Sequence, residues 1–315
     1  IREINDNRMF LSINDRIGQY VVIDLLSANP TSRVYLAKDV RIDLEVVIKI
    51  IPRNYSSEKD FLQGELMIMK KINHPNIVRL LDYIIKERCV YLILEYIDGG
   101  DLISHINKNR VFTEDEFKNI FREIVFALKY LRNMNISHCD IKLGNIVLTK
   151  NGRAKLIDFG YSTICYNKLC KRYCGTNCYV APEVLELIPF NPFKADIFSL
   201  GIVTAVCLTG HYPFIDNKYS KIDQSKLKNL SNQARNLVES MLVLNPAGRI
   251  TLNKLCYNEW TGNINNMKLY NSTIIIDYHI VELCGKYGMS KEILLYSLKR
   301  NYRDFFTSMY FTFML

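Results

Sequence analysis

The chain has 315 residues, 49% of them hydrophobic, with only 14 glycines and 8 prolines. This composition excludes long disordered tracts and provides enough apolar material for a two-lobed globular body with a small appendage. The formal net charge is +9, but the basic residues are spread along the chain. We therefore interpret them as a solvated basic surface, which argues against direct binding to nucleic acid or membranes.

The cysteines indicate the compartment. Nine of them occur without a recognisable signal peptide or an apolar run long enough to cross a bilayer, so we expect free thiols and a cytoplasmic and/or nuclear location. Four lie within residues 165–178, but no Cys-x-x-Cys pair or neighbouring histidine supports zinc binding there. The first residue is Ile1 rather than Met, which leaves the position of the natural N-terminus open.

After an N-terminal extension of residues 1–16, the first part of the chain is predicted to be rich in β-strands. Five strands are expected from apolar and β-branched runs, at residues 20–23, 33–37, 44–50, 77–81 and 89–94. Between the third and the fourth, residues 58–72 carry apolar side chains at helical spacing. The sequence His74-Pro75-Asn76 ends this helix, because proline restricts the residue before it to extended backbone.

The chain becomes helical after a turn at residues 98–100, which have the sequence DGG. Thr113 and Glu116 form a capping box that opens an amphipathic helix. This helix leads directly into His138. Further along, residues 195–209 are predicted to form a buried helix. The order of strands followed by helices indicates an α+β protein with two lobes.

The most informative segment lies at residues 138–145, with the sequence HCDIKLGN, followed by DFG at residues 158–160. Asp140 can receive a hydroxyl proton there, and Asp158 can hold a metal ion. This combination resembles the catalytic segment of the eukaryotic protein kinase family, and the resemblance extends from about Ile17 to Trp260. It implies the two-lobed protein kinase fold over residues 17–262.

The resemblance divides that domain into a small β-rich lobe at residues 17–97 and a large helical lobe at residues 98–262, and it assigns roles. Asp140 would orient the substrate hydroxyl and accept its proton, and Lys142 would neutralise the γ-phosphate of ATP. Asn145 and Asp158 would hold Mg²⁺, because a hard cation takes oxygen ligands.

The resemblance also places the nucleotide in the small lobe. Lys49, in the sequence VVIK, would pair the α- and β-phosphates and be held by Glu65. The further nucleotide-binding residues expected by position are Leu26, Ser27, Ala28, Asn29, Pro30, Thr31, Ser32, Arg33, Val34, Val47, Glu95, Ile97 and Val147. The glycine-rich loop of the family is replaced by SANPTS at residues 27–32, and Val47 crowds the adenine site. Weaker nucleotide binding is therefore predicted.

The substrate class follows from Lys142, because a lysine two residues after the base is the serine/threonine pattern. Thr176 is expected to bond Asp140 and Lys142 beneath the substrate, and Asp101 to read basic residues upstream of the target. We therefore expect a kinase that uses ATP and Mg²⁺ to phosphorylate serine or threonine in proteins. The altered loop leaves one alternative, a pseudokinase scaffold, but the six intact catalytic residues favour an active enzyme.

The activation segment departs from the family pattern. Cys139 stands where many relatives have the arginine that binds an activation-segment phosphate, and no serine or threonine directly precedes Cys174. We expect packing to hold this segment with little help from phosphorylation. Glu183 and Arg249 are expected to form a structural pair, and Asp196 to have a structural role at the head of the buried helix.

The C-terminal part is expected to form a linker at residues 263–274 and a separate helical tail at residues 275–315. The tail resembles the ubiquitin-associated-like module behind the kinase domain in relatives of the AMP-activated kinases. With the DGG turn and the activation segment, it places the chain in the calcium/calmodulin-type group, in the AMP-activated-kinase-related or the checkpoint effector branch. The alternative is a generic helical tail that packs onto the large lobe. A regulatory partner on the tail is expected.

Overall fold

The computed structural model describes residues 2–3, 10–29, 32–52, 59–109, 111–166, 169–216, 219, 221–264, 277–299, 307 and 309–311. The chain divides into two compact units. The first, which we call the small lobe, comprises Ile1–Asn73, Val78–Tyr96 and Asn271–Leu315. The second, the large lobe, comprises His74–Ile77 and Ile97–Tyr270. Each lobe is described by itself.

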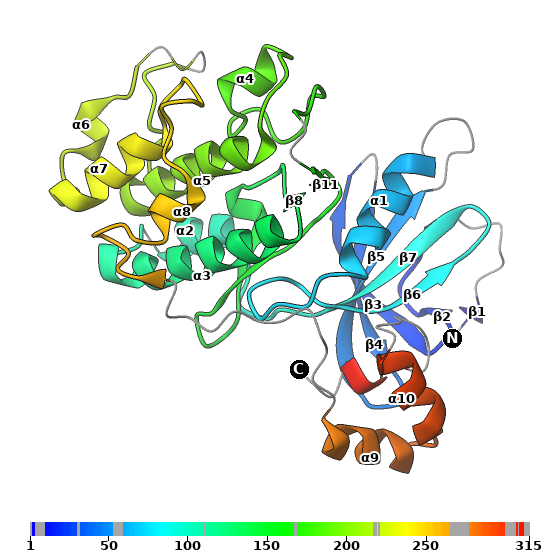
Figure 1. The fold of residues 1–315 in the computed structure, drawn as a ribbon. Coiled ribbons are helices and arrows are strands. Elements are labelled where there is room, and N and C mark those ends of the chain that lie inside the picture. Colours follow the sequence, from blue (N-terminus) through cyan, green and yellow to red (C-terminus); the bar gives the residue numbers. More distant parts are fainter. Residues whose placement is uncertain are drawn as a thin grey trace. The chain divides into compact units, whose positions relative to one another are not determined.

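The small lobe contains a seven-stranded sheet in the order β1-β2-β3-β4-β5-β7-β6 (Figure 1). Its strands are β1 (Arg2–Glu3), β2 (Asp15–Ile17), β3 (Tyr20–Ala28), β4 (Arg33–Asp39), β5 (Leu44–Pro52), β6 (Leu80–Ile85) and β7 (Cys89–Glu95). All neighbouring strands are antiparallel except β1 and β2. Helix α1 (Lys59–Met69) follows β5, as the apolar spacing predicts.

The prediction of a strand at residues 77–81 is wrong in its position. The strand β6 begins at Leu80 and runs to Ile85. Ile77 instead forms an isolated bridge with Leu156. Both residues belong to the large lobe. Ile77 thus pairs with a residue far along the chain and does not enter the seven-stranded sheet.

The tail shares a hydrophobic core with the sheet of the small lobe. Helices α9 (Tyr278–Lys286) and α10 (Lys291–Lys299) follow Asp277, which caps α9 by accepting from the backbone N–H of His279 at 2.9 Å. Figure 1 draws them in orange and red beside the strands. The tail contributes these buried side chains to the core: Val281, Cys284, Met289, Leu294, Leu298, Met309, Tyr310 and Phe311.

The sheet contributes alternating residues from neighbouring strands to the same core. They are Tyr35 and Ala37 of β4, Val46, Ile48 and Ile50 of β5, and Tyr91 and Ile93 of β7. A period of two puts such residues on one face of a sheet, and that face needs a cover. The alternative that the tail packs onto the large lobe is therefore wrong. By sequence, Ser290 and Asp304 are candidate caps for the later helices of the tail. Ser290 Oγ accepts from the N–H of Ile293 at 3.4 Å, and Asp304 lies outside the described residues.

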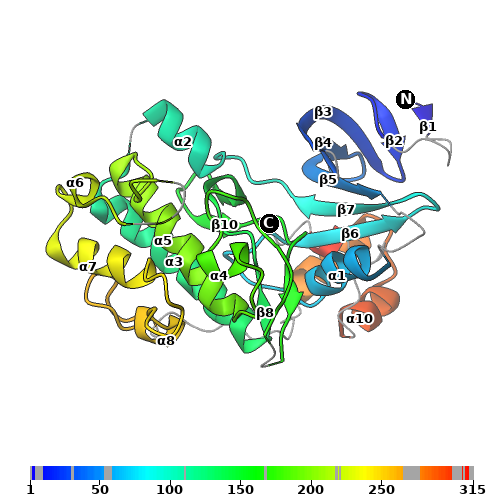
Figure 2. The same ribbon diagram turned by 90° about the horizontal axis from the view of Figure 1, so that it is seen from above.

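The large lobe is mainly helical. Its longer helices are α2 (Leu102–Asn109), α3 (Glu114–Asn133), α5 (Pro192–Thr209) and α7 (Asn232–Met241), and its short ones are α4 (Pro182–Leu185), α6 (Gln224–Leu227), α8 (Leu252–Leu255) and η1 (Leu143–Asn145). Two small antiparallel pairs join β8 (Ile136–Ser137) to β11 (Thr163–Ile164), and β9 (Ile146–Leu148) to β10 (Ala154–Leu156). Figure 2 shows α3 beside α5 in this lobe.

The starts of α3 and α5 follow from their sequences. Thr113 Oγ1 accepts from the N–H of Glu116, while the N–H of Thr113 donates to Glu116 Oε2 at 2.8 Å, so the predicted capping box is confirmed. Asn191 caps α5 ahead of Pro192. Contrary to the expectation from sequence, helix α5 is by length and composition apolar enough to cross a membrane, but 72% of it is buried inside the structure, as in the core helix of a globular lobe.

Candidate active site

The small lobe supplies a buried ion pair. Lys49 lies on β5 and Glu65 on α1, and their Nζ and Oε1 atoms are 2.7 Å apart. Only 8% of the lysine side chain and 6% of the glutamate side chain are exposed. Because the protein interior solvates charge poorly, each of these groups depends on the other for neutralisation. The ammonium group is thereby held in one place, as the sequence predicts.

The catalytic loop of the large lobe is built around the carboxylate of Asp196. Ser137 Oγ donates to Asp196 Oδ2 at 2.6 Å, and the N–H groups of His138 and Cys139 donate at 2.9 and 2.8 Å. Burial raises the pKa of Asp196, while these donors and His138 act in the opposite direction. Cys139 has a φ of 64°, a left-handed conformation that this three-donor anchor helps to hold. The predicted structural role of Asp196 is thus the fixing of the loop.

Asp140 is at the centre of a network in which both carboxylate oxygens have partners. Thr176 Oγ1 donates to Oδ1 at 2.8 Å, and Asn145 Nδ2 donates to Oδ2 at 2.9 Å. Lys142 Nζ lies 2.8 Å from Oδ2 and also donates to Thr176 Oγ1 at 2.9 Å. The Asp140 side chain is 1% exposed. The structure therefore brings together the predicted base, lysine, asparagine and threonine.

Asp158 and Asn145 are joined through the backbone. The N–H of Ile157 donates to the carbonyl of Asn145 at 2.9 Å, and the ring of His138 lies 3.0 Å from the carbonyl of Ile157 through Nε2. Asp158 has a φ of 63°, and its Oδ1 accepts from the N–H of Gly160 at 3.1 Å. These bonds hold the segment that carries Asp158 next to the catalytic loop.

The activation segment meets the catalytic loop at Gly175. Its φ is 99°, and an added Cβ would lie 3.0 Å from the carbonyl oxygen of Cys139 and 3.1 Å from Val180. Only glycine allows this close approach, which places Thr176 next to Asp140.

The thiols of Cys139 and Cys174 also share a hydrogen bond. This bond lowers the pKa of Cys174. The same bond, together with burial, raises the pKa of Cys139.

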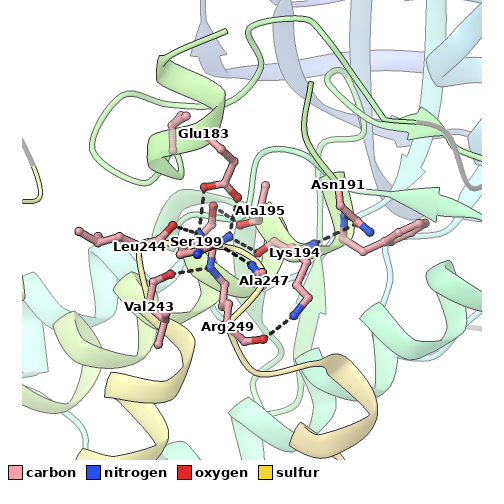
Figure 3. A network of polar contacts seen from close by, with 12 residues as sticks. Glu183, Asn191, Lys194, Ala195, Ser199, Val243, Leu244, Ala247 and Arg249 are labelled. Carbon is pink, nitrogen blue, oxygen red and sulfur yellow. Dashed lines mark hydrogen bonds and ion pairs between the residues drawn. The ribbon is translucent and has the colours of Figure 1, made fainter. Parts of the chain in front are cut away.

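Glu183 and Arg249 form the predicted structural pair (Figure 3). Both guanidinium NH groups bind the carboxylate, at 2.6 and 2.9 Å, and Arg249 is 1% exposed. The same guanidinium donates to the carbonyls of Val243, Leu244 and Lys194. A bidentate pair with further carbonyl partners satisfies a buried arginine, so it ties the end of the activation segment to the rest of the lobe.

The residues expected around the nucleotide phosphates lie on β3 and β4 and in the turn between them. The N–H of Asn29 donates to the carbonyl of Ser32 at 2.9 Å, which closes that turn. Leu26, Ser27, Ala28 and Asn29 are exposed, whereas Pro30 and Thr31 lie outside the described residues. The guanidinium of Arg33 lies 3.8 Å from the ring centroid of Phe10, a contact that sequence reasoning missed.

The residues expected around the adenine belong to both lobes. In the small lobe, Val47 on β5 is paired in register with Leu36 on β4 and Leu94 on β7. The carboxylate of Glu95, at the end of β7, accepts a hydrogen bond from the backbone N–H of Arg79 at 2.8 Å, so its side chain binds the backbone next to β6. Val34 lies on β4 and is half-buried.

The remaining expected residues belong to the large lobe. Around the adenine they are Ile97 and Val147 on β9. Asp101, which is expected to contact the substrate, also belongs to this lobe and forms an isolated bridge with Val147. Asp101 Oδ1 accepts from the N–H of Ser104 at 2.7 Å and so caps α2. Reading of upstream basic residues by Asp101 stays a prediction.

Sequence reasoning also missed how the activation segment is held. Arg172 donates to the carbonyl of Tyr161 at 2.5 Å and to that of Ser162 at 3.4 Å. Ser162 Oγ in turn donates to the carbonyl of His138 at 3.1 Å. The signal available in the sequence was a basic residue beside the cysteines, but its partners are backbone atoms, which a side-chain motif does not reveal.

The anchored catalytic loop, the Asp140 network and the buried Lys49–Glu65 pair define the class of protein, a protein kinase. The model of the protein kinase domain matches residues 21–261, and the chain belongs to this family. The fold and the family predicted from the catalytic segment are thereby confirmed.

Three relatives illustrate the similarity. The chain is 31% identical over 285 residues to CBL-interacting serine/threonine-protein kinase 8 of Arabidopsis thaliana. The aligned region covers 87% of this chain and 63% of that relative. It is 31% identical over 288 residues to the probable serine/threonine-protein kinase KIN1 homolog of Encephalitozoon cuniculi, an alignment that covers 86% of this chain and 51% of that relative. It is 27% identical over 318 residues to the serine/threonine-protein kinase SIK3 homolog of Danio rerio, an alignment that covers 94% of this chain and 27% of that relative. The chain thus spans less than two thirds of the length of these relatives.

Proposed function

We propose that the chain transfers the γ-phosphate of ATP to serine or threonine hydroxyls of protein substrates. The observation that carries this proposal is the Asp140 network, because a carboxylate held by Asn145, Lys142 and Thr176 is positioned to orient a hydroxyl. The serine/threonine type is supported by Lys142 and by the names of the relatives. Those relatives are named as kinases, so they give no support to the pseudokinase alternative.

The reaction follows from what each residue can do. Asp140 accepts a hydrogen bond from the attacking hydroxyl and takes its proton as the new bond to phosphorus forms. Lys142, which shares Asp140 Oδ2 and Thr176 Oγ1, brings positive charge to the transferred group. In the small lobe, Lys49 is held by Glu65 and binds the phosphates that remain with the nucleotide. Catalysis is then positioning and charge stabilisation rather than covalent chemistry.

The donor set fits Mg²⁺. The amide nitrogen of Asn145 donates to Asp140, so the side-chain oxygen is the atom suited to a metal, and Asp158 adds a carboxylate. Within the described part of the chain there is no group of three or more His, Cys, Asp and Glu residues that could hold a metal. Mg²⁺ needs no such group, because it is commonly bound by one or two protein oxygens together with phosphates and water. When bound, Mg²⁺ neutralises charge on the phosphates.

The proposal extends to the cell compartment, the substrate sequence and a partner. We propose cytoplasmic and/or nuclear action because all nine cysteines are free. We also propose that the substrates carry basic residues near the acceptor, since Asp101 lies at the start of α2, and that a regulatory partner binds the tail. The CBL-interacting relatives carry a partner in their printed names, which supports the proposal of a partner for this chain.

A thermal-shift titration tests the nucleotide half of the proposal. Addition of Mg-ATP should raise the unfolding temperature of the wild type, because a ligand that binds only the folded state stabilises it. Asp158→Asn should reduce the effect of Mg²⁺ on this shift while folding normally. Absence of any shift at millimolar Mg-ATP would favour the pseudokinase alternative.

A further inference from the structure

Two cysteines of the activation segment lie in direct contact. The sulfurs of Cys165 and Cys170 are 3.1 Å apart, and both thiols are free. A disulfide bond is about 2.05 Å long, so a movement of about 1 Å would join them. Cys165 is 4% exposed, and Cys170 is half-buried.

The contact is fixed by the backbone on both sides. The N–H of Cys165 donates to the carbonyl of Asn135 at 2.7 Å, directly after the pairing of β11 with β8. Cys170 forms an isolated bridge with Phe190, with N–H···O distances of 2.8 and 2.9 Å in the two directions. All four residues belong to the large lobe. The two sulfurs therefore meet between two anchored backbones, one on each side of the contact.

We propose that Cys165 and Cys170 are an oxidisable dithiol that forms a disulfide within the activation segment when the protein meets hydrogen peroxide or a related hydroperoxide. A disulfide in a reducing compartment is normally transient and sensory, which fits an enzyme with free thiols. The site is separate from the Asp140 network, and no step of the phosphoryl transfer uses either sulfur.

The chemistry balances with the peroxide as the oxidant. One sulfur, as thiolate, attacks a peroxide oxygen, so that an S–O bond forms, the O–O bond breaks and hydroxide leaves as water after protonation. The second sulfur then attacks the sulfenic sulfur, the S–S bond forms, and the S–O bond breaks with loss of a second water. Two thiols and one peroxide thus give one disulfide and two waters.

The environment distinguishes the two sulfurs. Burial raises the pKa of Cys170 to about 12, with a further contribution from the hydrogen bond to Cys165, while Arg172 opposes the shift. Cys170 therefore keeps its proton at neutral pH. We assign the first attack to Cys165 and the second, resolving attack to Cys170, whose proton leaves with the departing hydroxide.

The bond would stabilise the arrangement in which the sulfurs already touch. In that arrangement Thr176 donates to Asp140 and Arg172 holds the carbonyl of Tyr161. A disulfide removes freedom from the states in which the segment is detached, so the population shifts towards the ordered segment. Cys139 leaves this kinase without the arginine that binds an activating phosphate, so a covalent link could replace part of that function. This consequence for activity rests on the proposed kinase function, but the cross-link itself does not.

Peptide mapping without reduction tests the cross-link. Trypsin cuts after Lys155, Lys168 and Lys171, so the two cysteines fall in separate peptides, 156–168 and 169–171. After treatment of the whole chain with hydrogen peroxide, these peptides should appear joined, with the loss of two hydrogens, and should separate on addition of dithiothreitol. Cys139 lies in peptide 133–142, and both Cys174 and Cys178 lie in peptide 173–194, so a bond from Cys165 or Cys170 to any of these three would give joined peptides of a different mass.

Two variants make the result specific. Cys170→Ser should abolish the joined peptides, and its half-buried position makes normal folding the expected outcome. Cys178→Ser is the matched control, because this exposed cysteine lies in the same segment and should leave the joined peptides unchanged. Joined peptides that contain Cys174 or Cys139 instead, or sulfinic acid at Cys165 without a cross-link, would overturn the proposal.

The functional consequence has its own readout. Oxidation of the wild type should raise its unfolding temperature by about 2–5 °C and leave its kinase activity at least as high as in the reduced protein. Cys170→Ser should show neither the shift nor its reversal by dithiothreitol. A mapped Cys165–Cys170 bond that inactivates the enzyme would refute the stabilising role. If neither form phosphorylates a substrate, the proposed function fails while the mapped bond stands.

Discussion

Thr176 connects the substrate side of the site to the base. It donates to Asp140 and accepts from Lys142, so its hydroxyl fixes both charged groups. Thr176→Val should lower kcat by about tenfold or more, because a hydrogen bond to a charged group is lost while the side chain keeps its shape. Thr176→Ser, which keeps the hydroxyl, is the control. Steady-state kinetics with a peptide substrate would show the difference, and equal kcat values for the two variants would contradict the role of the hydroxyl.

Asp82 makes stability depend on pH. Burial raises its pKa from 3.8 to about 6, against the effect of the donors Tyr83 N–H, Tyr20 OH and Gln19 Nε2 and of the charge on Arg41. Since the folded pKa is above the unfolded pKa, the folded state binds more protons between pH 4 and 6, and wild-type stability falls as pH rises through this window.

Asp82→Asn cannot ionise and tests this effect. Its free energy of unfolding relative to that of the wild type should rise by about 2–3 kcal/mol between pH 4 and 6.5 and stay level above that range. Urea unfolding at a series of pH values measures it. A difference that is constant over the whole series would show that Asp82 keeps an ordinary pKa.

At the scale of elements, the segment between β3 and β4 has the sequence SANPTS at residues 27–32 in place of the family's glycine-rich loop. Gly at positions 27, 29 and 32 should lower the KM for ATP with little change in kcat, because the loop contributes binding shared by the ground and transition states. Ala at the same three positions is the control, since it removes the polar groups without adding access to positive φ. An unchanged KM in the glycine variant would mean that Val47, or contacts already made by the loop, set the affinity.

The tail helices are part of the small lobe's core. Leu294 of α10 is fully buried, whereas its neighbour Ile293 is 44% exposed. Leu294→Ala should lower the free energy of unfolding by about 2–5 kcal/mol, and Ile293→Ala should cost much less. Equal effects in thermal unfolding would argue against the packing of α10 on the sheet.

The sequence predicts elements best where the signal is local. The Thr113–Glu116 box gives the start of α3, and the catalytic segment gives the Asp140 network, because both depend on residues at fixed spacing. It fails where pairing is decided at long range: Ile77 has strand-forming character but bridges Leu156, and the tail's apolar faces do not reveal which lobe they cover. The Cys165–Cys170 contact depends on Asn135 and Phe190, which no spacing rule connects.

At the scale of the whole molecule, the contacts of Arg172 and Cys139 suggest an activation segment that is ordered without phosphate. Phosphatase treatment should therefore leave activity nearly unchanged, whereas deletion of residues 275–315 should alter it because the small lobe loses part of its core. Ser162, Thr163 and Tyr173 are the acceptors to monitor by mass spectrometry. A large loss of activity on dephosphorylation at one of them would refute this view of regulation.

The central claim, phosphoryl transfer with Asp140 as base, is tested most directly by incorporation of labelled γ-phosphate from Mg-ATP into a basic peptide with one serine. The wild type should label the serine, and Asp140→Ala should lower the rate by about 100- to 10,000-fold, since proton acceptance and orientation are both lost. Asp115→Ala, which removes an exposed carboxylate at the start of α3, is the matched control and should retain full activity. Equal rates for Asp140→Ala and the wild type, or no labelling by a folded wild type that binds Mg-ATP, would contradict the account.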